Sequence, residues 1–139
     1  MTSGPLLGID YGHRRIGVAI SDMEGISTTP LGFITRQDDR QAADVVLALA
    51  GQHHVTAIII GLPLNADGSR GKAATVATQF AKRLRRLGSV PVYSIDERYS
   101  SEEAADILAQ SHHSQPAPGR LDAQAAAIIL RRYLDEQQA

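Results

Sequence analysis

The 139-residue sequence contains no cysteine and no tryptophan, and its other aromatic residues are only four tyrosines and two phenylalanines. Without cysteine, disulfide bonds and thiolate metal sites are excluded, which fits a reducing compartment. So few aromatic residues argue against a base-stacking platform of the kind that single-strand-binding proteins use. No apolar stretch approaches a membrane span, and the first residues lack the basic and apolar segments of a signal peptide. We therefore expect a cytoplasmic protein without membrane contact.

A large excess of charge of either sign is also missing, because the formal net charge is only −1. Global charge therefore does not indicate a nucleic-acid-binding protein, and a polyanionic partner would have to be attracted by local basic residues and bound cations. The length corresponds to a single domain, 1–139, which can bury a hydrophobic core without disulfide bonds. The sequence shows no internal repeat, low-complexity segment or linker.

Hydrophobic periodicity predicts a mixed α/β domain. Apolar or alternating runs predict strands, and helically spaced apolar residues between start and stop signals predict helices. In chain order we expect strands at 6–10, 16–22 and 27–35, a helix from 38 or 39 to 51, a strand at 55–61, a helix at 73–87, a strand at 90–95, and helices at 101–110 and 120–136. The first three strands would form an antiparallel meander, with the third at the sheet edge because Pro30 lies near its start. The later βα units would complete a mixed five-stranded sheet with helices on both faces.

Three acidic residues stand where such a domain would place a metal site. Asp10 and Glu97 end apolar runs, and Asp122 opens the last predicted helix. The carboxyl ends of parallel strands meet at one sheet edge, so the carboxylates of Asp10 and Glu97 would lie close together, and a bound divalent cation would relieve their repulsion. Although a turn aspartate would explain Asp10 alone, we expect all three acids to bind a pair of Mg²⁺ or Mn²⁺ ions and to catalyse phosphodiester hydrolysis.

Glycines and basic residues near these acids are candidates for binding a nucleic-acid backbone. Glycines around Asp10, at positions 8, 12 and 17, would permit close approach of a phosphate, and the long loop at 62–71 offers backbone amides. The candidate substrate-binding residues are Gly12, Arg14, Arg15, Asn65, Arg70, Lys72, Arg98 and Arg120. Arg98 is equally suited to a salt bridge with Asp96 or Glu102. For the basic cluster at 82–86 a solvated helix face is favoured, and for His112 and His113 a surface loop.

Four segments occur in an order that resembles the YqgF (RuvX) family. They are Leu-Leu-Gly-Ile-Asp-Tyr-Gly at 6–12, Gly-Leu-Pro-Leu-Asn-Ala-Asp-Gly at 61–68, Asp-Glu-Arg-Tyr-Ser-Ser at 96–101 and Asp-Ala-Gln-Ala-Ala-Ala-Ile-Ile-Leu at 122–130. The second and third segments together are specific, and the resemblance covers nearly the whole chain. It implies an RNase H-like fold related to Holliday-junction resolvases, with Asp10, Glu97 and Asp122 matching the first, second and third catalytic acids. Two departures, Arg120 where lysine is common and Tyr99 where leucine is usual, leave these carboxylates intact.

The resemblance implies a metal-dependent endonuclease acting in the 5′-end maturation of pre-16S rRNA during ribosome biogenesis. The alternative within the same chemistry is a Holliday-junction resolvase-like DNA endonuclease, for which recognition of branched DNA would call for a homodimer. Two further classes stay open. One is a non-catalytic RNA or ribosome-assembly adaptor, and the other is an actin-like ATP-binding protein, which would need a second domain to enclose the nucleotide.

Overall fold

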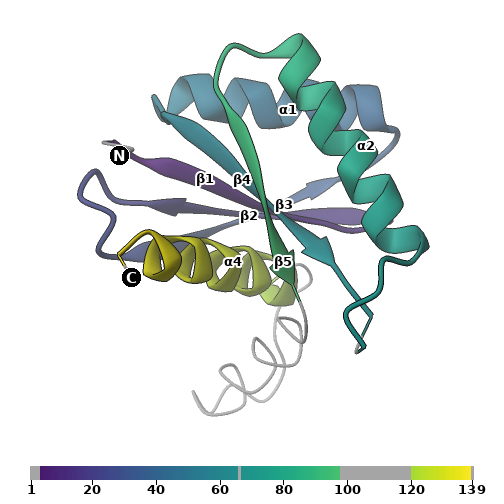
Figure 1. Ribbon diagram of the computed structural model, residues 1–139. Helices are drawn as coiled ribbons and strands as arrows, with labels where there is room; N and C mark the ends of the chain where they lie inside the picture. Colours follow the sequence, from purple (N-terminus) through teal and green to yellow (C-terminus); the bar gives the residue numbers. More distant parts are fainter. Residues whose placement is uncertain (1–3, 66, 98–119, 139) are drawn as a thin grey trace.

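The computed structural model describes residues 4–65, 67–97 and 120–138, without the side chains of Glu97 and Gln138. Its centre is a five-stranded sheet in the order β3-β2-β1-β4-β5, with α1 and α2 on one face and α4 on the other (Figure 1). The strands are β1 (Leu6–Tyr11), β2 (Arg15–Ser21), β3 (Thr28–Thr35), β4 (Ala57–Pro63) and β5 (Val92–Glu97), and the helices are α1 (Asp39–Gln52), α2 (Lys72–Leu87) and α4 (Arg120–Gln138). The predicted mixed sheet with helices on both faces is confirmed.

Strand directions decide which chain segments share a sheet edge. β1, β2 and β3 form the predicted antiparallel meander, with β3 at the edge, while β1, β4 and β5 run parallel. The carboxyl ends of β1, β4 and β5 therefore lie at one edge of the sheet. Asp10 is the second-last residue of β1, and Glu97 is the last residue of β5. The sheet thus brings both acids to the same edge, as the sequence predicted.

The sheet is covered on both faces because strand residues alternate between two hydrophobic clusters. Leu7 and Ile9 of β1 belong to the cluster beneath α1 and α2, whereas Leu6 belongs to the cluster beneath α4. Ile58, Ile59 and Ile60 of β4 are all fully buried. An uninterrupted apolar strand of this kind is typical of a parallel sheet with helices on both sides.

Two strands begin two residues later than their hydrophobic runs predict. The N–H group of Val55 donates to the Ala50 carbonyl at 3.0 Å, and that of Thr56 donates to the Pro5 carbonyl at 2.8 Å. Val55 is therefore held at the end of α1, and Thr56 is held beside the residue that precedes β1. β4 then continues to Pro63, and β5 is Val92–Glu97 instead of 90–95. The register of the β4–β5 pair, which ends at Pro63 and Glu97, determines these limits.

The predicted helix ends are close to the observed ones. Asp38 caps α1 by accepting a hydrogen bond of 2.8 Å from the backbone N–H of Gln41, and Gly88 follows the last residue of α2. The helix predicted at 101–110 and the loop predicted at 111–119 lie outside the described residues. None of the helices in the described part of the chain combines the length and apolar character needed to cross a bilayer.

Candidate catalytic site

Gly17 of β2 brings the start of α4 against the sheet beside Asp10. Gly17 and Asp10 are directly paired in the antiparallel β1–β2 ladder, where paired Cα atoms lie about 4.5–5.5 Å apart. A Cβ atom on Gly17 would lie 1.9 Å from the backbone carbonyl oxygen of Asp122. The first turn of α4 therefore occupies the space that any side chain at position 17 would fill, and it places the backbone of Asp122 next to Asp10.

Asp10 lies on the face of the sheet that α4 covers. Two residues earlier, a Cβ atom on Gly8 would lie 2.4 Å from Leu130 Cγ and 3.0 Å from the Ala126 carbonyl oxygen, both in α4. Since strand residues two apart share a face, Asp10 is on the α4 side, and it is partly exposed there. Two of the three predicted acids thus approach each other from different elements, one from β1 and one from the first turn of α4.

For Glu97, the third acid, the structure describes the position of the backbone and not that of the side chain. β4 lies between β1 and β5, and Glu97 pairs with Pro63 at the end of β4. In the described part of the chain, no group of three or more His, Cys, Asp or Glu side chains could hold a metal ion. Because the Glu97 side chain is outside that description, the meeting of three carboxylates stays a prediction. The carboxylates of Asp10 and Asp122 are suitable ligands for a hard divalent cation, since such ions prefer oxygen donors.

The glycines around Asp10 do not leave the room that the sequence suggested for a phosphate. Helix α4 fills the space above Gly8 and Gly17, and a Cβ atom on Gly12 would lie 2.4 Å from the Arg15 carbonyl oxygen of the same hairpin. Gly12 and Gly17 allow backbone to pack on backbone, and Gly8 makes room for the Leu130 side chain. The expectation of an open approach for a phosphate at Gly8 and Gly17 was therefore wrong. A contact of Gly12 with substrate stays a prediction.

Arg15 binds a candidate catalytic acid directly. Its Nε lies 3.0 Å from Asp122 Oδ2, and its guanidinium carbon lies 5.8 Å from the centre of the Phe33 ring. The Arg15 side chain is 46% exposed and that of Asp122 is 26% exposed, so this ion pair lies at the surface and contributes little to stability. Its main consequence is positional, because it restrains one oxygen of Asp122.

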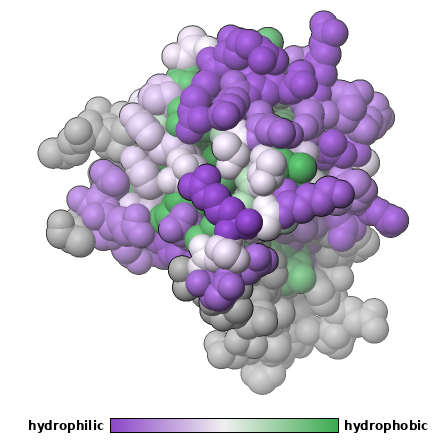
Figure 2. Space-filling model, turned by 45° about the vertical axis from the view of Figure 1, so that its right-hand side comes forward, coloured by the Kyte–Doolittle hydropathy of each residue, from purple (hydrophilic) through white to green (hydrophobic). Residues whose placement is uncertain are grey.

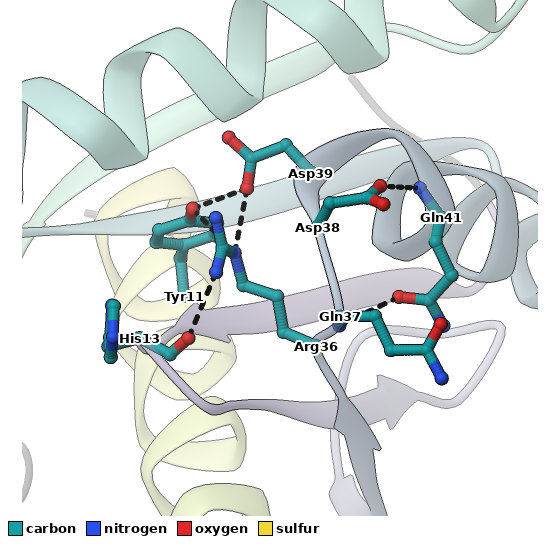
Figure 3. A network of polar contacts seen from close by, with 7 residues as sticks. All are labelled: Tyr11, His13, Arg36, Gln37, Asp38, Asp39 and Gln41. Atoms are coloured by element: carbon teal, nitrogen blue, oxygen red, sulfur yellow. Dashed lines mark hydrogen bonds and ion pairs between the residues drawn. The ribbon is translucent and has the colours of Figure 1, made fainter.

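A polar network holds the chain segment that follows Asp10 (Figure 3). The Tyr11 hydroxyl donates to Asp39 Oδ1 at 2.5 Å, and Arg36 Nε lies 2.8 Å from the same oxygen and 3.0 Å from the Tyr11 hydroxyl. Arg36 also donates to the His13 carbonyl through Nη1 at 3.2 Å, and to the Arg14 carbonyl through its backbone N–H at 2.8 Å. The network therefore joins the end of β1, the β1–β2 turn and the start of α1.

The network also shifts the ionisation of its members. Burial raises the pKa of Tyr11, and the hydrogen bond to Asp39 raises it further. Burial would raise the pKa of Asp39, but the hydrogen bonds from Tyr11 and Arg36 outweigh it and hold that pKa below its ordinary value. The pKa of Arg36 is raised, chiefly by its hydrogen bond to Asp39. At neutral pH the three side chains are therefore a neutral phenol, a carboxylate and a guanidinium.

We expect Asp39→Asn to lower the free energy of unfolding by about 1.5–3 kcal/mol at pH 7, because it removes a charged hydrogen-bond acceptor. Since the pKa of Asp39 is lower in the folded than in the unfolded state, its stabilising contribution is present above about pH 4 and is lost as the pH falls through the folded value. Urea unfolding at pH 7, 5 and 3 should show the gap between wild type and variant narrowing below pH 4. The control is Asp44→Asn, at an exposed position of α1. A gap of constant size at all three pH values would contradict this account.

The remaining predicted substrate-binding residues lie around this sheet edge without forming one cluster. Asn65 helps close the loop after β4, since its Nδ2 donates to Ser69 Oγ at 3.0 Å and its backbone N–H to the Ser69 carbonyl at 3.0 Å. Arg70 pairs with Leu64 across that loop, and Lys72 begins α2. Arg14, Asn65, Arg70, Lys72 and Arg120 are all exposed. Arg98 lies outside the described residues. The roles of these side chains in substrate binding stay predictions.

The basic cluster at 82–86 is partly structural. Arg85 donates to the Val92 carbonyl through Nε at 3.0 Å and through Nη2 at 2.8 Å, which fastens α2 to β5. Lys82 and Arg86 are exposed. This agrees with the interpretation of a solvated helix face.

Figure 2 brings forward the side of Figure 1 on which β4 ends. The face it shows is mainly hydrophilic, with small hydrophobic areas between polar side chains.

Solved structures with the same arrangement define the class of this domain. Thermus thermophilus RuvC in complex with a Holliday junction substrate matches 97% of this chain with 96% of its own, at a TM-score of 0.60 and 16% identity. The Fowlpox virus resolvase, in complex with Holliday junction DNA, matches 97% of this chain with 99% of its own, at a TM-score of 0.59 and 10% identity. At these identities the likeness concerns the fold alone, and the fold is RNase H-like.

Sequence relatives identify the family. Residues 4–136 match the family described as "RuvX: Holliday junction resolvase". A Synechococcus elongatus protein named "Putative pre-16S rRNA nuclease" is 39% identical over 133 residues, which cover 95% of this chain and 89% of that protein. A Rhodococcus opacus protein of the same name is 42% identical over 140 residues, covering 96% of this chain and 79% of that protein. The chain belongs to the RuvX family, and the resemblance seen in its motifs is confirmed.

Proposed function

We propose that this chain is a single-domain, divalent-cation-dependent endonuclease that hydrolyses phosphodiester bonds in precursor 16S rRNA. Asp10, Glu97 and Asp122 are its catalytic acids and its metal ligands. The substrate assignment follows the names of relatives that are about 40% identical over most of the chain. An rRNA substrate also implies action in the cytoplasm during ribosome biogenesis.

The observation that carries this proposal is the contact between Gly17 and the Asp122 backbone. Gly17 is the pairing partner of Asp10, so the contact brings two acids from distant parts of the chain to one place. Glu97 ends β5 at the same sheet edge, about 10 Å from β1 across the sheet and about 7 Å further along. Divalent cations held by these carboxylates would bridge a separation of this size.

The residues of the chain have separate tasks in this proposal. When bound, Mg²⁺ or Mn²⁺ supplies a Lewis acid that polarises a phosphoryl oxygen and makes water a better nucleophile at neutral pH. Asp10 and Asp122 provide oxygen ligands from two elements that pack directly on each other. Arg15 orients the Asp122 carboxylate, and the network of Tyr11, Arg36 and Asp39 fixes the strand end beside Asp10. Exposed basic residues around the edge neutralise the substrate backbone.

A second candidate substrate is branched DNA. It is supported by the description of the family as Holliday junction resolvases and by the shared fold of two resolvases solved with junction DNA. The same three acids would perform the same phosphodiester hydrolysis. Cleavage of two strands of a junction would require two sites at a fixed separation, and hence a homodimer.

A cleavage panel tests the function and separates the two substrates. Matched RNA hairpin, single-stranded RNA and four-way DNA junction are incubated with wild type and with Glu97→Gln, in Mg²⁺ and in Mn²⁺. We expect wild type to cleave the RNA, and Glu97→Gln to be slower by about a thousandfold, since it removes several kcal/mol of transition-state stabilisation. Cleavage of the junction alone would support the second candidate. Equal rates for wild type and Glu97→Gln, or no cleavage with either metal, would contradict both.

A further inference from the structure

Phe33 lies in line with the candidate catalytic site. It is paired with Gly17 in the β2–β3 ladder, and Gly17 is paired with Asp10 in the β1–β2 ladder. Directly paired residues of antiparallel strands share a face of the sheet, so Phe33 lies on the same face as Asp10, two strands away. The separation of the two strands is about 10 Å.

The Phe33 ring is open to solvent although it belongs to a strand of the central sheet. Phe33 is 40% exposed, while its neighbour Ile34 is buried in the cluster beneath α1 and α2. Only two phenylalanines occur in the chain, and the other, Phe80, is fully buried. Packing of the core therefore does not account for an aromatic ring at position 33.

Arg15 connects this ring to the catalytic acids. Its guanidinium stands 5.8 Å from the ring centre, while its Nε binds Asp122 Oδ2 at 3.0 Å. Exposed arginine and aromatic planes are the surfaces on which unpaired bases stack, and a positive charge beside them also attracts the phosphate backbone. An exposed ring and a cation thus stand together at the rim of a site for phosphodiester cleavage.

We propose that Phe33, with Arg15 beside it, is a stacking site for one unpaired nucleobase of the substrate strand, next to the scissile phosphate. This inference rests on the proposed function. It adds a preference for one kind of substrate, namely a strand with an unstacked base near the cleavage point. Fully paired double helices offer no such base. A single ring of this kind is compatible with the absence of an extended aromatic platform.

The absence of tryptophan from the chain allows a direct optical test. Phe33→Trp in the Asp10→Asn background gives a protein with one tryptophan that does not consume its substrate. We expect single-stranded RNA or DNA to quench this fluorescence, and an oligonucleotide of the same length with abasic sites, or a fully paired duplex, to quench it much less. RNA and DNA of the same sequence, titrated in parallel, identify which nucleic acid supplies the base. Tyr93→Trp, at a position 43% exposed on the opposite sheet edge, is the control and should not respond to bases.

A second variant measures the effect on affinity. Phe33→Leu should weaken binding of a base-bearing single strand by about fivefold to a hundredfold, and leave binding of the abasic strand unchanged. Equal quenching by abasic and base-bearing strands, or unchanged affinity of Phe33→Leu, would overturn the stacking site. Wild-type cleavage is measured separately. A wild type that cleaves while Phe33 fails both tests refutes only this inference, and a wild type that never cleaves refutes the proposed function.

Discussion

Asp10→Asn is expected to slow phosphodiester cleavage by about a thousandfold or more while leaving the folded protein intact. The variant keeps the size of the side chain and removes the charge that a divalent cation requires, which costs several kcal/mol of transition-state stabilisation. Asp10 is only partly exposed, and in the proposed site it lies beside two further carboxylates, so loss of its charge would also remove repulsion. Single-turnover cleavage rates and thermal unfolding, measured on the same samples, give the two quantities.

Asp96→Asn is the matched control for this experiment. Asp96 is an exposed aspartate in β5, one residue before Glu97, so the variant makes the same chemical change at the same sheet edge. We expect its cleavage rate to stay within about twofold of wild type, as for most exposed positions outside the site. If Asp10→Asn cleaves the substrate as fast as Asp96→Asn, Asp10 is not a catalytic acid.

Gly17→Ala should slow cleavage strongly, although it adds only one methyl group and removes no catalytic side chain. Its Cβ atom would meet the Asp122 carbonyl oxygen at 1.9 Å and the Asp122 carbonyl carbon at 2.3 Å. These are backbone atoms, so α4 must move away from the sheet. We expect a loss of about 1–3 kcal/mol in the free energy of unfolding, typical of overpacking. The displacement of Asp122 should slow cleavage by about a hundredfold, the usual effect of a shift of about 1 Å in a catalytic group.

Gly51→Ala is the control for this substitution. A Cβ atom on Gly51, near the end of α1, has no atom within 4 Å. Alanine is favoured over glycine in a helix, so we expect a gain of up to about 1 kcal/mol and full activity. Chemical denaturation and cleavage rates distinguish the two glycines. If Gly17→Ala matches Gly51→Ala in both, α4 does not pack on β2 as closely as described.

Much of the fold follows from local sequence patterns. The meander, the edge position of β3 at Pro30 and the uninterrupted apolar strand β4 could be predicted from periodicity and proline chemistry. The limits of β4 and β5 could not, because they depend on pairing between the two strands and on hydrogen bonds to Ala50 and Pro5. Hydrophobic runs indicate where a strand is buried, whereas its register is fixed by residues distant in sequence.

The sequence predicted that the backbones of Asp10 and Glu97 share a sheet edge, but not the contacts around them. The rule that parallel strands share a carboxyl edge brings Asp10 and Glu97 to one edge. The role of Gly17 was misread as room for a phosphate, although a glycine within a β-branched strand also indicates close approach of another backbone. The contacts of Tyr11 with Asp39 and Arg36 have no local signal, since they join residues 28 and 25 positions apart. Arg15 was assigned to the substrate backbone, and the structure adds its ion pair with Asp122.

The central claim is that the carboxylates of Asp10, Glu97 and Asp122 bind divalent cations together. Crystals of the protein soaked in Mn²⁺ test it most directly, because anomalous scattering locates the metal independently of the protein atoms. We predict one or two Mn²⁺ peaks about 2.0–2.3 Å from carboxylate oxygens of all three residues, and their loss in Asp10→Asn. Mn²⁺ bound elsewhere, or a Glu97 carboxylate turned away from the other two, would contradict the account.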